Sequence, residues 1–409
     1  MKIVFRAGFG ITFALLIYFI INYHPFRFTY KELGKMRFFF LMAVLFFIAI
    51  LLERVYISPN EPALSQSGIK TYTILIQLPF WGLLGFWLAR DVATFRRLLE
   101  KLAMMAAILS VAYFVVSRLD IVESLLQGPF NWQLRFFSLF GFFWYLFQYL
   151  RSSSTRDTAV GLICCALEVF VEFHKPVVVS AVVGSLVMII LITVYDKERR
   201  SALTKFFTLT AMAIVGFAII NVIAGGTIYD KMEEKFFQKY LHVNANATSG
   251  DYTVSNDYSV LISKASGGRL ILWGLAFKAV QQSPWIGSGF GQVFENDFYG
   301  GQSLPVHSEY MDVLISVGIS GLLILFVAIF WFLKVALSGL RARSNLLIII
   351  PGLAFITAIS TYNAGGQILW FEPVCYLTFL LVGAVIQLAP AQVAHYSHHP
   401  YLSRLLGKS

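Results

Sequence analysis

Residues 176–195 read PVVVSAVVGSLVMIILITVY, twenty residues without a charged side chain. An α-helix needs about 20 apolar residues to cross the hydrocarbon core of a bilayer, so this stretch is long enough to span a membrane. Pro176 stands at its start, where a first-turn proline loses no hydrogen bond because its missing N–H would have no helical partner. The stretch therefore predicts a transmembrane helix that begins at Pro176.

Apolar stretches of this kind recur along almost the whole chain. Of its 409 residues, 58% are hydrophobic and 13% are charged, whereas about a quarter of the residues of a soluble domain are charged. This composition excludes a soluble, peripheral or single-span protein. It predicts an all-α, polytopic integral membrane protein of about 11–12 transmembrane helices. The candidate spans lie near residues 7–23, 37–52, 71–89, 102–117, 136–150, 158–173, 176–195, 205–225, 310–336, 346–362 and 367–389.

Lysine and arginine are divided unevenly between the two sets of loops. Positive charge resists translocation, so the loops richer in these residues are expected in the cytoplasm. The richer set carries nineteen of them: Arg27, Lys31, Lys35, Arg37, Arg90, Arg96, Arg97, Lys101, Arg151, Arg156, Lys197, Arg199, Arg200, Lys205, Lys334, Arg341, Arg343, Arg404 and Lys408. The alternating set carries seven: Lys2, Arg6, Arg54, Lys70, Arg118, Arg135 and Lys175. Residues 226–307 then lie on the opposite side, which in a bacterial inner membrane is the periplasm.

The spans and loops divide the chain into four predicted parts. These are an N-terminal transmembrane bundle (1–225), a periplasmic loop domain that contains interfacial helices (226–307), C-terminal transmembrane helices (308–389) and a cytoplasmic tail (390–409). Eleven spans with a cytoplasmic C-terminus place Met1 outside, although Lys2 and Arg6 favour the inside. A twelfth crossing, which hydropathy does not locate, would place both termini in the cytoplasm.

Two further classes of function are set aside on composition. The net charge of +10 is the basic excess expected of cytoplasmic loops beside anionic lipid headgroups, so no nucleic-acid partner is expected. Cys164, Cys165 and Cys375 lie inside apolar runs and have neither the spacing of a metal site nor that of a disulfide framework. They are expected to be small core residues.

The long loop carries the first candidate cation. Residues 267–280 (GGRLILWGLAFKAV) predict an apolar helix in the membrane interface, with Arg269 and Lys278 as isolated cations. The Arg269 guanidinium either extends to lipid phosphates or binds a phosphate or diphosphate group through two parallel hydrogen bonds. Residues 284–291 (PWIGSGFG) then predict a glycine-rich turn, without the lysine of a nucleotide-binding loop.

Two further basic residues are expected on the same face of the membrane. His307 precedes the span at 310–336, where an imidazole is either structural or acts as a base near neutral pH. Glu309 beside it is interpreted as a partner of the helix dipole. Lys175 lies in the shortest outward loop, and Glu168 and Glu172, one turn apart, are its candidate partners in a structural ion pair or a substrate site. Together Lys175, Arg269 and His307 suggest a diphosphate cradle.

These residues resemble the O-antigen ligase and polymerase family, integral membrane glycosyltransferases of Gram-negative surface polysaccharide assembly. The resemblance rests on Arg269 followed by Trp273, then PWIGSGFG at 284–291, His307 and GISGL at 318–322. It implies an undecaprenyl-diphosphate-linked glycan donor, no metal ion or other cofactor, and essential roles for Arg269 and His307. An earlier basic residue of the family, often in a serine-arginine context, matches Lys175, although the preceding His174 departs from that pattern.

The predicted reaction transfers O-antigen polysaccharide from undecaprenyl diphosphate to a hydroxyl of the lipid A core, with inversion. Arg269 and Lys175 would stabilise charge on the leaving diphosphate, and His307 would orient or deprotonate the acceptor. The same family also contains O-antigen polymerases, which use the same donor chemistry. A transporter of lipid-linked sugars is the alternative from another class. The sequence shows neither the repeated halves nor the broken helices that such transporters usually carry.

Overall fold

The computed structural model describes most of the predicted spans. The described residues are 30–57, 66–116, 129–151, 156–171, 175–196, 199–223, 269–289, 294–296, 302–304, 306–343, 345–366 and 372–390. The predicted span at 7–23 and nearly all of the predicted cytoplasmic tail lie outside these ranges. The described helices account for the other ten predicted spans. A twelfth crossing, which the sequence leaves open, would therefore have to lie outside the described residues.

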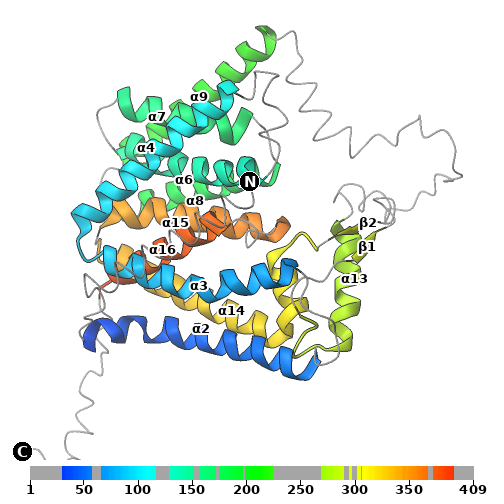
Figure 1. Ribbon diagram of the computed structural model, residues 1–409. Helices are drawn as coiled ribbons and strands as arrows, with labels where there is room; N and C mark the ends of the chain where they lie inside the picture. The colour runs from blue at the N-terminus through cyan, green and yellow to red at the C-terminus, as the bar shows by residue number, and fades with distance from the viewer. Residues whose placement is uncertain are drawn as a thin grey trace, which may run out of the picture.

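Ten helices of the described residues form a bundle, and each corresponds to one predicted span (Figure 1). They are α2 (Tyr30–Ile57), α3 (Gln66–Leu88), α4 (Val92–Val116), α6 (Pro129–Arg151), α7 (Arg156–Ala166) with its π-helical continuation η2 (Leu167–Val171), α8 (Lys175–Tyr195), α9 (Arg199–Ile223), α14 (Glu309–Arg341), α15 (Leu346–Gly365) and α16 (Glu372–Leu388). Five of them, α2, α4, α8, α14 and α15, contain a stretch long and apolar enough to cross a membrane. The prediction of an all-helical, multi-pass membrane protein is confirmed.

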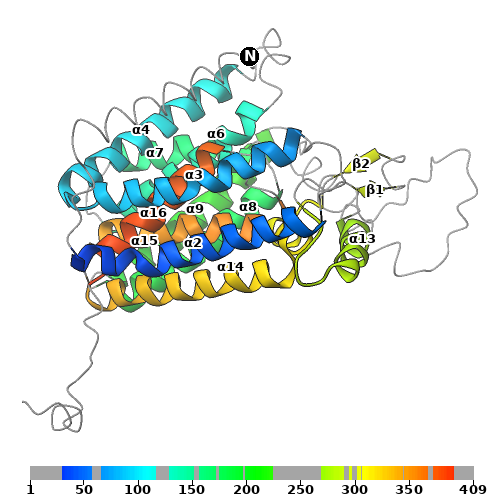
Figure 2. The same cartoon turned by 60° about the horizontal axis from the view of Figure 1, so that its bottom comes forward.

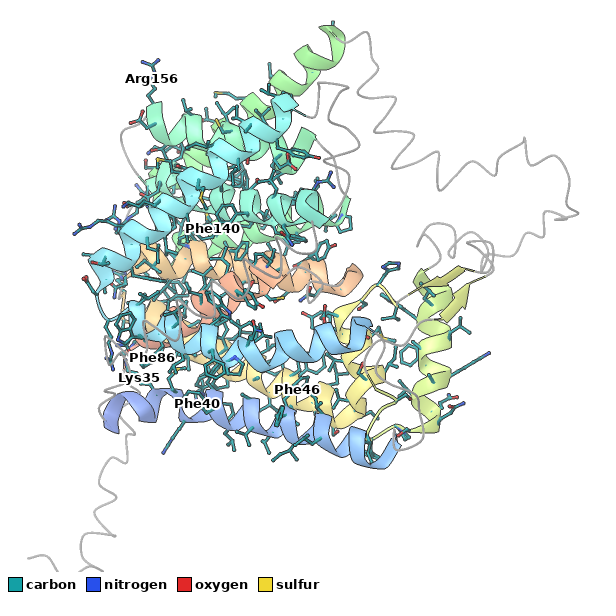
Figure 3. All side chains as sticks on the ribbon, viewed as in Figure 1. Lys35, Phe40, Phe46, Phe86, Phe140 and Arg156 are labelled. Carbon is teal, nitrogen blue, oxygen red and sulfur yellow. The ribbon has the colours of Figure 1, made fainter. Side chains whose placement is uncertain are left out.

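The loops of the bundle group at two opposite ends. Lys35 Nζ, near the start of α2, donates hydrogen bonds to the carbonyl oxygens of Gln387 and Ala389 at the end of α16, each at 2.9 Å. Arg151 Nε at the end of α6 lies 3.1 Å from Asp196 Oδ2 after α8. Lys35 and Arg156 lie at the same end of the molecule (Figure 3). The helix ends richer in lysine and arginine therefore lie together, as the charge pattern predicts.

Phenylalanine dominates the apolar core. The rings of Phe140 and Phe355 meet edge to face with centroids 5.6 Å apart, and those of Phe136 and Tyr362 meet edge to face at 4.6 Å. The outside of the bundle is also apolar, since Phe330 is 69% exposed. A bundle that is apolar both inside and outside suits a lipid environment. Cys165 and Cys375 are buried and Cys164 is half-buried, in agreement with the prediction that they are core residues.

Small residues let α3 and α16 approach closely. A β-carbon added to Gly85 would clash with the carbonyl group of Leu380, and one added to Gly383 would clash with the carbonyl group of Gly82. Membrane helices often use glycine in this way because close backbone approach increases van der Waals contact where water supplies no hydrophobic force. The α3–α16 pair joins an early helix to the last described one. Helix α8 likewise packs against the late helix α15, and α2 packs against the late helix α14.

A smaller unit lies at the end of the bundle opposite to the start of α2 (Figures 1 and 2). Helix α13 (Arg269–Gln282) runs across this end rather than along the bundle, and the strands β1 (Phe294–Asn296) and β2 (Gln302–Leu304) form an antiparallel pair. The helix matches the one predicted from residues 267–280. The strand pair was not predicted, because three-residue strands are too short to show an alternating pattern.

Candidate functional site

The start of α14 is joined to the end of α15 by hydrogen bonds. Ser308 caps α14: its hydroxyl accepts a hydrogen bond from Met311 N at 3.5 Å and donates one to the carbonyl oxygen of Asn363 at 3.3 Å. Glu309 N donates to the carbonyl oxygen of Gly366 at 3.1 Å. These bonds satisfy backbone groups that both helix ends would otherwise leave without partners. They hold the segment beside His307 against the end of α15.

His307 has an unusual backbone conformation. Its φ of 53° lies in the left-handed region, which residues with a β-carbon rarely adopt. The residues on either side, Val306 and Ser308, are buried, and His307 itself is partly buried. The surrounding structure thus holds this backbone turn, and the turn sets the direction in which the imidazole leaves the chain. Strained conformations of this kind concentrate at functional sites.

Two buried carboxylates follow His307 in the first turn of α14. Glu309 is 6% exposed and Asp312 is 8% exposed. Their position at a helix N-terminus is electrostatically favourable, which agrees with the interpretation of Glu309 as a partner of the helix dipole. Asp312 was missed by the sequence analysis. The signal that identifies it is a carboxylate three residues after Glu309, on the same helical face and at the edge of an apolar span.

Helix α14 is broken at Gly318, which has a φ of 71° and a ψ of −168°. The sequence pattern indicated no broken helix, and that prediction is wrong for this span. The reason is physical: glycine in an apolar run changes neither the hydropathy nor the helical period, so a local change of backbone angle leaves no trace in either. The helical segments on the two sides of the break are 309–317 and 319–341.

The glycine-rich turn after α13 fills this break. Ser288 N donates to the carbonyl oxygen of Ile315 at 2.6 Å, and Gly289 N donates to that of Ser316 at 3.1 Å. In the other direction, Ile319 N donates to the carbonyl oxygen of Pro284 at 2.8 Å. The turn therefore supplies partners for backbone groups on both sides of the break.

Glycine is required on both sides of this contact. Gly287 has a φ of 84°, and a β-carbon there would lie 2.5 Å from the carbonyl carbon and oxygen of Ser316. At Gly318 a β-carbon would lie 2.5 Å from the carbonyl carbon and oxygen of Trp285. The two backbones thus approach more closely than any residue with a side chain allows.

Helix α13 packs directly on the start of α14. Ala276 and Val280 of α13 form a buried apolar cluster with Val306, Leu314 and Ile315. Trp273 packs against the same cluster. Arg269 is the first residue of α13, one helical turn before Trp273. The structure therefore brings the helix that begins at Arg269 together with the segment that carries His307.

Lys175 is the first residue of α8, at the same end of the bundle. Helix α8 packs against α15, whose end is bonded to the start of α14. Lys175 is thus connected to the His307 segment through α15, whereas Arg269 is connected to it by direct packing of α13. The side chains of Arg269 and Lys175, and the whole of Glu172, lie outside the described part of the chain.

Glu168 has a partner that the sequence analysis did not name. Its Oε1 lies 3.6 Å from Arg135 Nε on α6, and the two side chains are 0% and 11% exposed. Glu168 belongs to the π-helical turn η2, a local widening of the helix that often marks functional positions. Because Phe136, next to Arg135, contacts Tyr362 near the end of α15, this ion pair also lies toward the end of the bundle that carries His307.

The fold and these contacts define a multi-pass membrane protein in which a helix that runs across one end of the bundle meets a broken transmembrane helix and His307, the residue before the N-cap of that helix. Residues 178–326 match the family model of the O-antigen ligases. The match contains Arg269, the glycine-rich turn, His307 and the break at Gly318, and it confirms the resemblance seen in the sequence. No curated protein matches the chain. The family consists of membrane glycosyltransferases that act on lipid-linked glycans.

Proposed function

We propose that the protein is an O-antigen ligase of the bacterial inner membrane. It transfers O-antigen polysaccharide from undecaprenyl diphosphate to a sugar hydroxyl of the lipid A core and releases undecaprenyl diphosphate. One observation carries the proposal: within the family domain, the helix that begins at Arg269 packs on the segment that carries His307. Two residue types suited to this chemistry are thus supplied by adjacent elements.

Binding of the donor diphosphate is assigned to Arg269 and Lys175. Each is the first residue of a helix, α13 and α8 respectively. Helix N-termini present free N–H groups and a positive partial charge, so they add to the attraction of a cationic side chain for phosphate. As the bond from the anomeric carbon to the diphosphate oxygen breaks, the oxygen keeps the electron pair. Cations held near that oxygen in a site of low dielectric constant stabilise the transition state.

Activation of the acceptor is assigned to His307. The acceptor hydroxyl oxygen forms the new bond to the anomeric carbon, and its proton passes to the imidazole. The buried carboxylate of Glu309, two residues after His307, favours the positive charge that the imidazole then carries. Attack opposite to the leaving diphosphate inverts the anomeric centre. The proposed site therefore needs no covalent glycosyl intermediate.

The proposed site faces the periplasm. This assignment is supported by the position of α13 and the strand pair at the end of the bundle opposite to Lys35 and Arg156 (Figures 1 and 3). The loops richer in lysine and arginine belong to the Lys35 end, and such loops stay in the cytoplasm.

The break in α14 is the one observation that favours the transporter alternative, because transporters bind substrates at interrupted helices. In this chain, however, carbonyl and N–H groups beside the break are bonded to residues 284–289. A transporter would need such groups for its substrate. The observation therefore supports a structural use of the break.

The test uses the full-length protein purified in detergent, with a polyprenyl-diphosphate-linked glycan and a lipid A core acceptor. We expect a new glycosidic product from the wild type and from Lys278→Ala, which replaces the other, exposed cation of α13, and a loss of product from His307→Ala. Absence of product with active controls would favour a transporter. In cells, lipopolysaccharide gels separate ligase from polymerase. Loss of a ligase leaves polymer on the lipid carrier, whereas loss of a polymerase leaves core with a single repeat unit.

A further inference from the structure

The break in α14 creates backbone groups that need partners within a membrane protein. Ending one helical segment at residue 317 and starting another at residue 319 frees carbonyl groups before the break and N–H groups after it. Each such group costs several kcal/mol if it stays unpaired in hydrocarbon. The partners are supplied from residues 284–289, about thirty positions earlier in the chain.

A side-chain hydrogen bond completes this contact. Ser320 Oγ donates to the carbonyl oxygen of Trp285 at 2.7 Å, and it also lies 3.1 Å from the carbonyl oxygen of Val317 in its own helix. The Ser320 hydroxyl, which follows the break, therefore contacts both the turn, at Trp285, and the helical segment before the break, at Val317. We use the name latch for residues 284–289 together with residues 315–320.

The latch is continuous with the two elements that carry the proposed site. Within the turn, Ser283 N donates to the carbonyl oxygen of Val280 at 3.1 Å and Gly287 N to that of Ser283 at 2.9 Å, so the turn extends α13 without a gap. On the other side, the helical segment 309–317 leads back to His307. Fixing the turn to the break therefore fixes the end of α13 relative to the His307 segment.

The remaining contact between α13 and α14 does not by itself fix the position of α13 relative to the His307 segment. The cluster of Ala276, Val280, Val306, Leu314 and Ile315 is apolar, and apolar contact is not directional. Hydrogen bonds between backbones, in contrast, are lost when the partners slide by about 1 Å. The latch is the described contact that sets the register of α13 on α14.

We propose that the latch positions the Arg269 helix relative to His307 for glycosyl transfer, with Ser320 as a positioning residue. The inference rests on the proposed function for its kinetic consequence. The effect of the latch on the distance between α13 and α14 can be measured without any reaction. Misplacement of reacting groups by about 1 Å lowers turnover about 100-fold, so a contact of this kind acts on kcat more than on donor binding.

The kinetic experiment compares Ser320→Ala with Ser320→Thr and Ser338→Ala. Loss of the Ser320 hydroxyl should lower kcat about 2- to 10-fold while the KM for donor changes less than about 2-fold, because one hydrogen bond is removed far from the diphosphate. Threonine keeps the hydroxyl and should restore kcat. Ser338 is the matched control, since its hydroxyl bonds the carbonyl oxygen of Val335 three residues earlier in the same helix, at 2.7 Å. Unchanged kcat in Ser320→Ala, or an equal loss in Ser338→Ala, overturns the proposal.

A second variant, at Gly318, prevents the close backbone contact of the latch and should have a larger effect than Ser320→Ala. Gly318→Ala places a β-carbon against the Trp285 carbonyl and should lower kcat about 100-fold. Gly274→Ala on α13, where a β-carbon meets open space, is its control. If Gly318→Ala fails to fold, Ser320→Ala carries the test.

The distance experiment makes the proposal independent of activity. Spin labels on cysteines at the exposed positions 278 of α13 and 334 of α14, with the native cysteines replaced, report the distance between these helices by pulsed electron paramagnetic resonance. We expect one narrow distribution in the wild type and a broader or shifted one in Ser320→Ala. An identical distribution refutes the latch even when His307→Ala is inactive. If the distribution is broader in Ser320→Ala than in the wild type but the wild type has no transferase activity, the proposed function is refuted and the latch still stands.

Discussion

At the scale of single residues, His307 combines a chemical group with an uncommon backbone. Its φ of 53° suits glycine or asparagine better than histidine. A histidine is retained where a residue without a β-carbon would be less strained. This supports a role for the imidazole itself rather than for the turn.

Substitution at this position separates the two roles. His307→Gly keeps the left-handed turn and should leave the melting temperature unchanged or slightly raised, because glycine adopts this φ without steric strain. Glycosyl transfer should fall more than about 100-fold because the proposed base is gone. Thermal unfolding followed by tryptophan fluorescence and a product assay check both parts. Near-normal transfer by a folded His307→Gly would remove His307 from the catalytic assignment.

The guanidinium of Arg269 is the second test at this scale. Arg269→Lys keeps the charge but loses the planar fork that binds two phosphate oxygens. We expect turnover to fall about 10-fold and donor affinity to weaken, and Arg269→Ala to lose more than Arg269→Lys. Equal activity of the lysine variant and the wild type would show that only the charge matters. Titration of donor at fixed acceptor gives both constants.

At the scale of elements, the bundle depends on two kinds of interhelical contact. One is the close approach of backbones at glycine, as between α3 and α16. The other is the buried ion pair between α6 and η2. The two contacts respond differently to substitution, because the first is limited by space and the second by the cost of an uncompensated charge.

Space between α3 and α16 is tested by Gly85→Val. The added side chain would meet the carbonyl group of Leu380 and force the helices apart, so we expect a loss of stability of about 3 kcal/mol or more. Gly352→Ala on α15 is the control, because a β-carbon there meets only Leu381 Cδ2 at 3.9 Å, an ordinary contact. Unfolding in a denaturing detergent measures both variants. Equal stability of the two would contradict the packing described for this crossing.

Removal of one partner tests the ion pair of Arg135 and Glu168. Glu168→Ala leaves the guanidinium without its buried counter-charge and should cost about 3–5 kcal/mol, whereas the double variant Arg135→Met/Glu168→Leu should cost less than that single change. The exposed pair of Arg96 and Glu100, joined at 2.8 Å with side chains 42% and 41% exposed, is the control. Glu100→Ala should cost less than about 1 kcal/mol. A double variant less stable than Glu168→Ala would refute a purely electrostatic cause.

At the scale of the whole molecule, helices from distant parts of the chain form one bundle with two distinct ends. Several early helices pack against late ones: α2 contacts α14, α3 contacts α16 and α8 contacts α15. Arg269, Lys175 and His307 therefore begin or precede helices at one end, although 132 positions separate the first and last of these residues in the sequence. The proposed site depends on this arrangement.

Sidedness follows from the same arrangement and is testable in cells. A cysteine at position 278 should react with a membrane-impermeant maleimide added to spheroplasts. A cysteine at position 343, exposed at the other end of α14, should react only after the inner membrane is opened, because its loop is rich in positive charge. Variants that each keep transferase activity provide the folding control. Reaction of position 343 in intact spheroplasts would reverse the proposed orientation.

Much of the fold was predictable from local sequence. Ten predicted spans match helices, and the helix at 267–280 was predicted with its first cation at Arg269. The site was predictable only in part. Asp312 and Ser320 lie inside an apolar span, and Arg135 lies in a stretch that gave no reason to pair it with Glu168. Ser320 and Arg135 acquire their importance from partners more than thirty positions away, Trp285 and Glu168 respectively.

The sequence by itself determined which segments enter the membrane, which ends of them carry positive charge and which family the chain resembles. These are local properties, because the cost of burying a polar group in lipid is set residue by residue over about 20 positions. The tertiary structure alone decided that α14 is broken, that residues 284–289 bond to the break and that Arg135 faces Glu168. A hydrogen bond or an ion pair needs two partners at a defined distance, and neither hydropathy nor helical period contains that distance.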